Sequence, residues 1–195
     1  MYGRAFQVVA FFVTFLPGVA FANDPVCQAY WFDRNNIFDR AGYCFSSNLG
    51  KAVFDNSDCV SSNVTLSKAD KAHVQRIKEA EMNWRCDGNN KVTRFPDEVE
   101  LMEVRRKLTE PPVRDSFESM CIGFNGSQNI PLYAAPDSTA EVLGYVERGD
   151  NITFSHISGR DGWEFSYAVD PNSFRYKALG WHNTDLTNGC DEIAG

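Results

Sequence analysis

Six cysteines constrain the fold of this chain more than any other feature of its sequence. They follow an apolar N-terminal segment and stand at Cys27, Cys44, Cys59, Cys86, Cys121 and Cys190. An even number of cysteines in an exported chain is typical of disulfides, and none has the C-x-x-C spacing of a zinc or redox site. Sequence alone allows many pairings. Position favours Cys27 with Cys86 and Cys121 with Cys190, which would join the ends of two modules, and Cys44 with Cys59, which would close a short loop.

The first 22 residues have the pattern of a secretory signal. Arg4 precedes an apolar run over residues 5–16, and Ala20-Phe21-Ala22 has the small residues that a signal peptidase accepts. The alternative of a membrane anchor is disfavoured, because the apolar run is shorter than the about 20 residues of a spanning helix. We therefore expect a signal peptide at residues 1–22, a periplasmic or secreted protein, and no membrane insertion after cleavage.

The charge balance limits the classes of partner. The chain has 26 acidic and 19 basic residues and a net charge of −7 at pH 7. Such a charge argues against binding to nucleic acid or to an anionic membrane through bulk electrostatics. The sequence contains no metal-ligand cluster, phosphate loop or dinucleotide fingerprint. We therefore expect neither a metal nor a cofactor.

The order of the sequence patterns predicts two small modules and a connector. The first module, residues 23–86, begins with a helix, and a later helix starts at Ser67, with Asp70 as its capping partner. Its apolar face is predicted from residues that recur at helical spacing. These residues are Ala69, His73, Ile77, Ala80 and Trp84.

The connector, residues 87–118, is predicted to contain a helix that opens at residues 95–98, where a proline precedes two acids. Leu101, Val104 and Leu108 form an apolar stripe on this segment, so we expect it to pack on one of the modules. From residue 119 to residue 195 the pattern changes to short strands separated by Gly, Asp and Asn turns. Such spacing is typical of a small all-β barrel.

Residues 34–45, with the sequence RNNIFDRAGYCF, resemble the core of the YARHG domain and its related DUF4453 type. This bacterial extracytoplasmic module has the signature Arg-Asn-x-Ile-Tyr-Ala-Arg-His-Gly-Tyr-x-Phe. Phe38 stands here in the tyrosine position, Asp39 in that of the first alanine, and Ala41 in that of the histidine. The replacement by Ala41 removes the titratable group of the signature, which argues against catalysis.

The C-terminal segments LYAAPDS, VLGYVERGD, DGWEFSY and GWHNTDL resemble a bacterial SH3-like (SH3b) domain. The two resemblances together imply an α+β protein. It would have a small, mostly helical, disulfide-stapled N-terminal module followed by a C-terminal SH3-like β-barrel.

Two arginines and two aromatic residues are the candidate ligand-binding residues. Arg34 and Arg40 lie six positions apart and could hold a small anion or carboxylate between two guanidinium groups. The alternative is that they pair internally, for example with Asp39 or Asp55, and stabilise the fold.

Tyr133 and Trp181 could line a groove on the barrel, whereas Trp163 is the aromatic residue best suited to its core. His182 follows Trp181 in the last predicted strand, where an exposed position is plausible. The three histidines, His73, His156 and His182, are scattered over both modules and suggest no catalytic site.

The resemblances imply a non-enzymatic protein that binds a cell-wall component, either peptidoglycan glycan or stem peptide. One alternative is a module that binds or inhibits another envelope protein. A further alternative is a wall hydrolase that uses acids of the first module, such as Asp39 and Asp55. The cell-wall hypothesis rests on analogy at the level of the fold.

Overall fold

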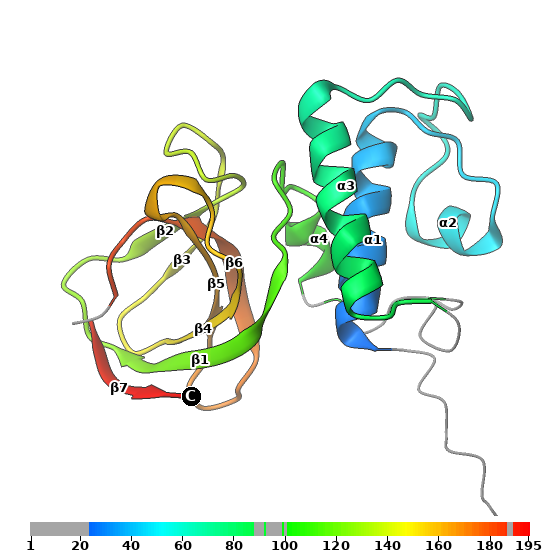
Figure 1. Ribbon diagram of the computed structural model, residues 1–195. Helices are drawn as coiled ribbons and strands as arrows, with labels where there is room; N and C mark the ends of the chain where they lie inside the picture. Colours follow the sequence, from blue (N-terminus) through cyan, green and yellow to red (C-terminus); the bar gives the residue numbers. More distant parts are fainter. Residues whose placement is uncertain (1–23, 88–91, 93–98, 100, 187–188) are drawn as a thin grey trace, which may run out of the picture.

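A computed structural model describes residues 24–87, 92, 99, 101–186 and 189–195. The predicted signal peptide and the predicted helix start at residues 95–98 lie outside the described residues. The described chain forms a helical part and a β-sheet part, side by side in Figure 1, and its class is α+β. The helices are α1 (Pro25–Arg40), α2 (Asn48–Val53), α3 (Lys68–Asn83) and α4 (Met102–Arg105). The strands are β1 (Arg114–Phe124), β2 (Ile130–Tyr133), β3 (Val142–Val146), β4 (Asn151–His156), β5 (Glu164–Val169), β6 (Tyr176–His182) and β7 (Cys190–Ala194).

The two long helices α1 and α3 begin at side-chain caps. The Asp24 carboxylate accepts hydrogen bonds from the backbone N–H groups of Val26 and Cys27 at the start of α1. The Ser67 hydroxyl accepts one from the N–H of Asp70 at the start of α3. Such caps satisfy N–H groups that the first turn of a helix leaves unpaired. The predicted helix start at Ser67 is confirmed.

The buried face of α3 differs in register from the predicted one. Val74, Ile77 and Ala80 are its buried residues, and this face packs against α1. His73 is only partly buried, and its Nδ1 lies 2.7 Å from Nη2 of Arg76. Val74 therefore takes the core position predicted for His73, because an aliphatic side chain is buried without leaving ring nitrogens to pair.

The strands form a seven-stranded antiparallel sheet in the order β3-β2-β6-β5-β4-β1-β7. The sheet bends strongly around its core in Figure 1. Its hydrogen-bonded ladder nevertheless ends at β3 and β7, which do not pair with each other among the described residues. The expected closed SH3-like barrel is therefore not confirmed: β7 adds to the outer edge of β1 and leaves its own edge free.

The sheet has an apolar cluster on each of its two faces, since alternate residues of a strand point to opposite sides. Side chains from β1 to β6 meet in the inner cluster, which comprises Cys121, Phe124, Ile130, Leu132, Val146, Ile152, Ala168, Ala178 and Leu186. The outer cluster lies on β5 and β6 and comprises Trp163, Phe165, Tyr167, Val169, Leu179, Trp181 and the connector residue Leu108.

The connector covers this outer cluster. Leu108 is buried there, and Leu101 and Val104 are partly buried against the same residues. The prediction that the apolar stripe of the connector packs on a module is confirmed. The helical module meets the other side of this segment, and α4 lies between the two parts in Figure 1.

A buried side chain in α4 joins the connector to both modules. Nε and Nη2 of Arg105 each donate to the Asp33 carboxylate of α1 at 2.7 Å, and Nη1 donates to the Tyr167 hydroxyl of β5 at 2.7 Å. The Arg105 and Asp33 side chains are only 2% and 1% exposed. Burial lowers the pKa of the Arg105 guanidinium, but Asp33 and Tyr167 together outweigh burial and hold this pKa above its ordinary value. Arg105 of α4 thus joins three elements, through an ion pair with α1 and a hydrogen bond with β5.

Three disulfides stabilise the chain, two in the helical module and one in the sheet. They join Cys27 to Cys86, Cys44 to Cys59, and Cys121 to Cys190. These are the pairs that position favours in the sequence. The third joins β1 to β7, so the edge strand is attached to the sheet covalently as well as by hydrogen bonds.

Candidate functional site

The two candidate arginines each have an internal partner. Nε of Arg34 donates to both carboxylate oxygens of Glu81 on α3, at 3.1 and 3.0 Å. Nη1 of Arg40 donates to the backbone oxygen of Leu108 at 2.8 Å, and its Nη2 lies 3.9 Å from the Asp70 carboxylate. The structure therefore does not bring the two guanidinium groups to one common partner. It agrees with the alternative of internal pairing, although the partners are not the predicted Asp39 or Asp55.

The aromatic candidates of the sheet belong to its outer cluster. Trp181 is only 3% exposed, and its Nε1–H donates to the backbone oxygen of Glu110 at 2.8 Å. Tyr133 is partly buried, and its ring meets that of Trp163 edge to face, with the ring centroids 5.6 Å apart. Trp163 is buried, as predicted. Although the connector covers most of Trp181, its side chain borders a smaller pocket of about 240 Å³ together with residues of α3. The expected role of Tyr133 and Trp181 in ligand binding therefore stays a prediction.

His182 also differs from its predicted exposure. Its ring is 1% exposed, and Nε2 lies 3.0 Å from the Ser166 hydroxyl in the neighbouring strand. Burial lowers the pKa of His182 to about 4, against a smaller opposing effect of the Thr184 backbone. The imidazole is therefore neutral at pH 7 and serves as a buried polar contact.

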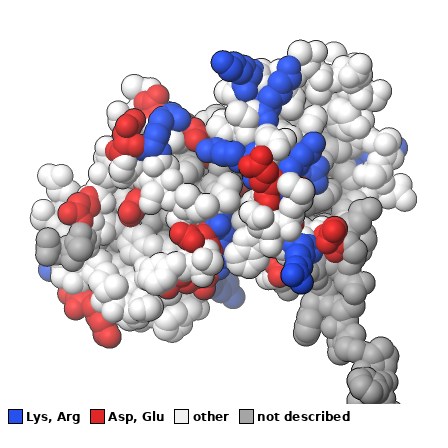
Figure 2. Space-filling model, viewed as in Figure 1, with Lys and Arg blue, Asp and Glu red and all other residues white. Residues whose placement is uncertain are grey.

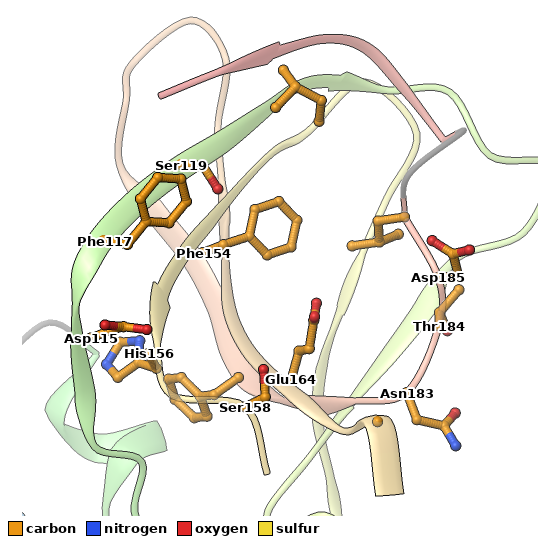
Figure 3. Close-up of a pocket in the computed structure, with 14 residues that line it drawn as sticks. Asp115, Phe117, Ser119, Phe154, His156, Ser158, Glu164, Asn183, Thr184 and Asp185 are labelled. Carbon is orange, nitrogen blue, oxygen red and sulfur yellow. The ribbon is translucent and has the colours of Figure 1, made fainter.

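A pocket of about 560 Å³ opens on the sheet, away from all four candidate residues. Figure 3 shows side chains from β1, β4, β5 and the segment after β6 around it. The lining residues are Asp115, Phe117, Ser119, Phe154, His156, Ser158, Gly162, Glu164, Phe165, Asn183, Thr184, Asp185, Leu186 and Ile193. This volume lies within the range of about 300–1,000 Å³ that small-ligand sites occupy.

An irregularity in the pairing of β1 with β4 shapes this pocket. Arg114 is opposite His156, but the next paired residue of β1, Ser119, is opposite Phe154. The intervening residues of β1 are therefore in excess of those on β4, as in a β-bulge, and such bulges redirect side chains. Two of these excess residues, Asp115 and Phe117, line the pocket. The bulge thus supplies both an acid and an aromatic ring to the site.

The pocket combines apolar walls with three carboxylates. Asp115, Glu164 and Asp185 line it, and no Lys or Arg stands among its described lining residues. Partial burial raises the pKa of Glu164, and the charge of Asp185 raises it further, so the two carboxylates are close enough to repel. His156 adds no positive charge at pH 7, because burial holds its pKa well below the ordinary value, with Arg105 and Arg114 acting in the same direction. The pocket is therefore acidic.

Sequence reasoning missed this pocket. Asp115 and Phe117 fall in the segment assigned to the connector, and residues 183–186 are too polar to indicate a core.

Among the described residues, no cluster of three or more His, Cys, Asp or Glu side chains has the arrangement of a metal site. None of the described helices is long and apolar enough to span a membrane. The site can offer apolar contact and negative charge to a ligand.

Comparison with known families assigns both parts of the chain. The YARHG domain model matches residues 15–82, in agreement with the resemblance of residues 34–45. The three disulfides indicate an oxidising compartment, so the chain is of an extracellular type. The model described as "Domain of unknown function (DUF4453)" matches residues 85–195, more than half of the chain, and the protein belongs to this family.

The DUF4453 match lies on the sheet and connector, whereas the sequence reading attached that name to the helical module. An SH3b domain is not identified in this region. No curated protein matches the chain, and no solved structure matches it. The site must therefore be interpreted from its own geometry.

Proposed function

We propose that this protein is an exported, non-catalytic binding module of the bacterial cell envelope, and that the acidic pocket is its ligand site. The ligand would be a cell-wall component, either peptidoglycan glycan or stem peptide. The pocket carries this proposal, since it is large enough for a ligand and offers apolar walls beside charged groups. We also infer that the bent sheet is an open relative of the SH3-like barrel.

The test is co-sedimentation of the oxidised protein with isolated peptidoglycan. Saturable binding that Glu164→Gln weakens would support the proposal and its location. Glu79→Gln is the matched control, because it removes the same charge from an exposed position on α3 that does not line this pocket, where Glu79 accepts a hydrogen bond from Gln75. Sedimentation no greater than that of the reduced, unfolded chain would refute cell-wall binding.

A second candidate function is binding or inhibition of another envelope protein. It is favoured by Phe117 and Ile193, which line the pocket and are 62% and 54% exposed. Ile193 lies on β7, whose free edge could pair with a strand of a partner. A partner recovered without muropeptides, and lost with Phe117→Ser but not with the exposed control Phe174→Ser, would establish this function.

The hydrolase alternative has one observation in its favour. Burial raises the pKa of Asp39, Arg106 opposes this rise, and Asp58 and Asp55 add to it, so these acids lie near one another on the helical module. The Asp55 carboxylate, however, accepts bonds from the backbone and hydroxyl of Ser57. Release of soluble muropeptides by the purified protein, abolished by Asp39→Asn, is the result that this alternative requires.

A further inference from the structure

We propose that the pocket takes a ligand with an amine at the end of an apolar stem, and that Glu164 is the counter-ion of that amine. An alkylammonium group, such as the side chain of lysine or of another diamino acid, has this chemistry. The inference rests on the proposed function in one respect only, because both use the same pocket. Among cell-wall components it selects a stem peptide with a free amine over glycan.

The first argument comes from the walls of the pocket. Phe154 and Phe117 stand on β4 and β1, and their rings face the space in Figure 3, with Phe165, Leu186 and Ile193 also in the lining. Rings and aliphatic groups of this kind exclude water from a methylene chain, which is favourable in proportion to the apolar area covered. The walls would therefore hold the stem of the ligand.

The second argument comes from Glu164. Its side chain points into the pocket in Figure 3, and it makes no hydrogen bond or ion pair with any residue that the structure describes. Its electrostatic neighbour is Asp185, a like charge. A bound ammonium group would relieve this repulsion, whereas a carboxylate would add to it. Glu164 is itself exposed at the pocket, so its pairing with an ammonium group would have the modest strength of an ion pair at a protein surface.

The third argument comes from the surroundings of the pocket. On the face shown in Figure 2, acidic side chains are spread over the sheet, and Lys and Arg side chains lie at its upper edge, at the junction and on the helical module. The chain carries a net charge of −7. At long range, the net negative charge of the chain therefore favours the approach of a cation over that of an anion.

The test compares three ligands that share one stem: hexylamine, hexanol and hexanoate. Each is titrated into the isotope-labelled, oxidised protein, and amide chemical shifts of the pocket are followed by NMR. We expect hexylamine to bind about fivefold more tightly than hexanol, which is the scale of a partly exposed ion pair, and hexanoate to bind more weakly than either. Glu164→Gln should abolish the preference for the amine, whereas Glu79→Gln, at a residue that does not line this pocket, should retain it.

Each outcome decides the inference. Equal binding of hexylamine and hexanol to the native protein, or an amine preference that survives Glu164→Gln, would overturn it. A folded Glu164→Gln variant is recognised by amide shifts that are unchanged outside the pocket. If the amine preference is present but peptidoglycan does not co-sediment, the cell-wall proposal fails and the inference stands. If peptidoglycan binds and the amine preference is absent, the cell-wall proposal stands and the inference fails.

Discussion

Removal of one partner from the buried pair Asp33–Arg105 should destabilise the protein strongly. Both side chains are at most 2% exposed, and they share two hydrogen bonds of 2.7 Å. Loss of either partner leaves an uncompensated buried charge, which costs about 3–5 kcal/mol. This is a large part of the about 5–15 kcal/mol by which a folded protein is stable. We therefore expect both Asp33→Leu and Arg105→Met to lower the free energy of unfolding by about this amount.

A double-mutant cycle separates the pair from its two members. Asp33→Leu combined with Arg105→Met removes both charges, so its cost should be much smaller than the sum of the two single costs. Tyr167→Phe adds an intermediate case, because it removes the hydroxyl that accepts from Nη1 of Arg105 and leaves the ion pair with Asp33 in place. Its cost should be about 1–3 kcal/mol.

The assay is urea unfolding of the oxidised protein at pH 7, followed by circular dichroism for the helices and by tryptophan fluorescence. Because Arg105 contacts elements of both modules, we expect the native protein to unfold in one transition and the single variants to unfold their two modules separately. Single variants that each cost less than about 1 kcal/mol, or costs that simply add in the double variant, would refute this view of the interface.

Three further predictions concern other buried features. Replacing both cysteines of Cys121–Cys190 by alanine should lower the stability of the fold by about 4 kcal/mol, because this disulfide closes a loop of 69 residues. The same change at Cys44–Cys59, which closes a loop of 15 residues, should cost about 3 kcal/mol. Thermal unfolding of the two variants measures which is less stable, and a greater loss at Cys44–Cys59 would contradict the prediction. His182 has a pKa of about 4 in the folded state and 6.5 as its ordinary value, so the unfolded state takes up the proton first and up to about 3 kcal/mol of stability is lost as the pH falls from 6.5 to 4. A His182→Gln variant that lost as much stability over this window as the native protein would show the histidine to be irrelevant. Trp181→Phe removes the donor to the Glu110 backbone and should cost about 1–3 kcal/mol in urea; unchanged stability would mean that the bond contributes nothing.

Local sequence signals predicted those parts of the fold that depend on local chemistry. Ser67 and Asp70 are three residues apart, so the cap that begins α3 can be read from a short stretch. The strand pattern after residue 119 also reflects turns that are local. The sequence alone does not show which residues of α3 are buried, because His73 and Val74 are adjacent and only packing against α1 decides between them.

The remaining features depend on residues that are distant in the sequence. Arg105 lies 72 residues from Asp33 and 62 from Tyr167, and no pattern within the connector distinguishes it from an exposed arginine. The burial of Trp181 likewise depends on the connector, whose apolar residues pack in the same cluster. The pocket escapes prediction for the same reason, since the bulge that directs Asp115 and Phe117 into it exists only once β1 has paired with β4.

The Cys27–Cys86 disulfide bears on how this protein can be divided. The YARHG match ends at residue 82 and the DUF4453 match begins at residue 85, so the two sulfur atoms lie on opposite sides of the boundary between the families. A fragment cut at that boundary would carry an odd number of thiols, free to form mixed dimers with other chains. When the two segments stay in one chain, each cysteine keeps its disulfide partner. A truncated protein should therefore end beyond Cys86, or both Cys27 and Cys86 should be replaced together.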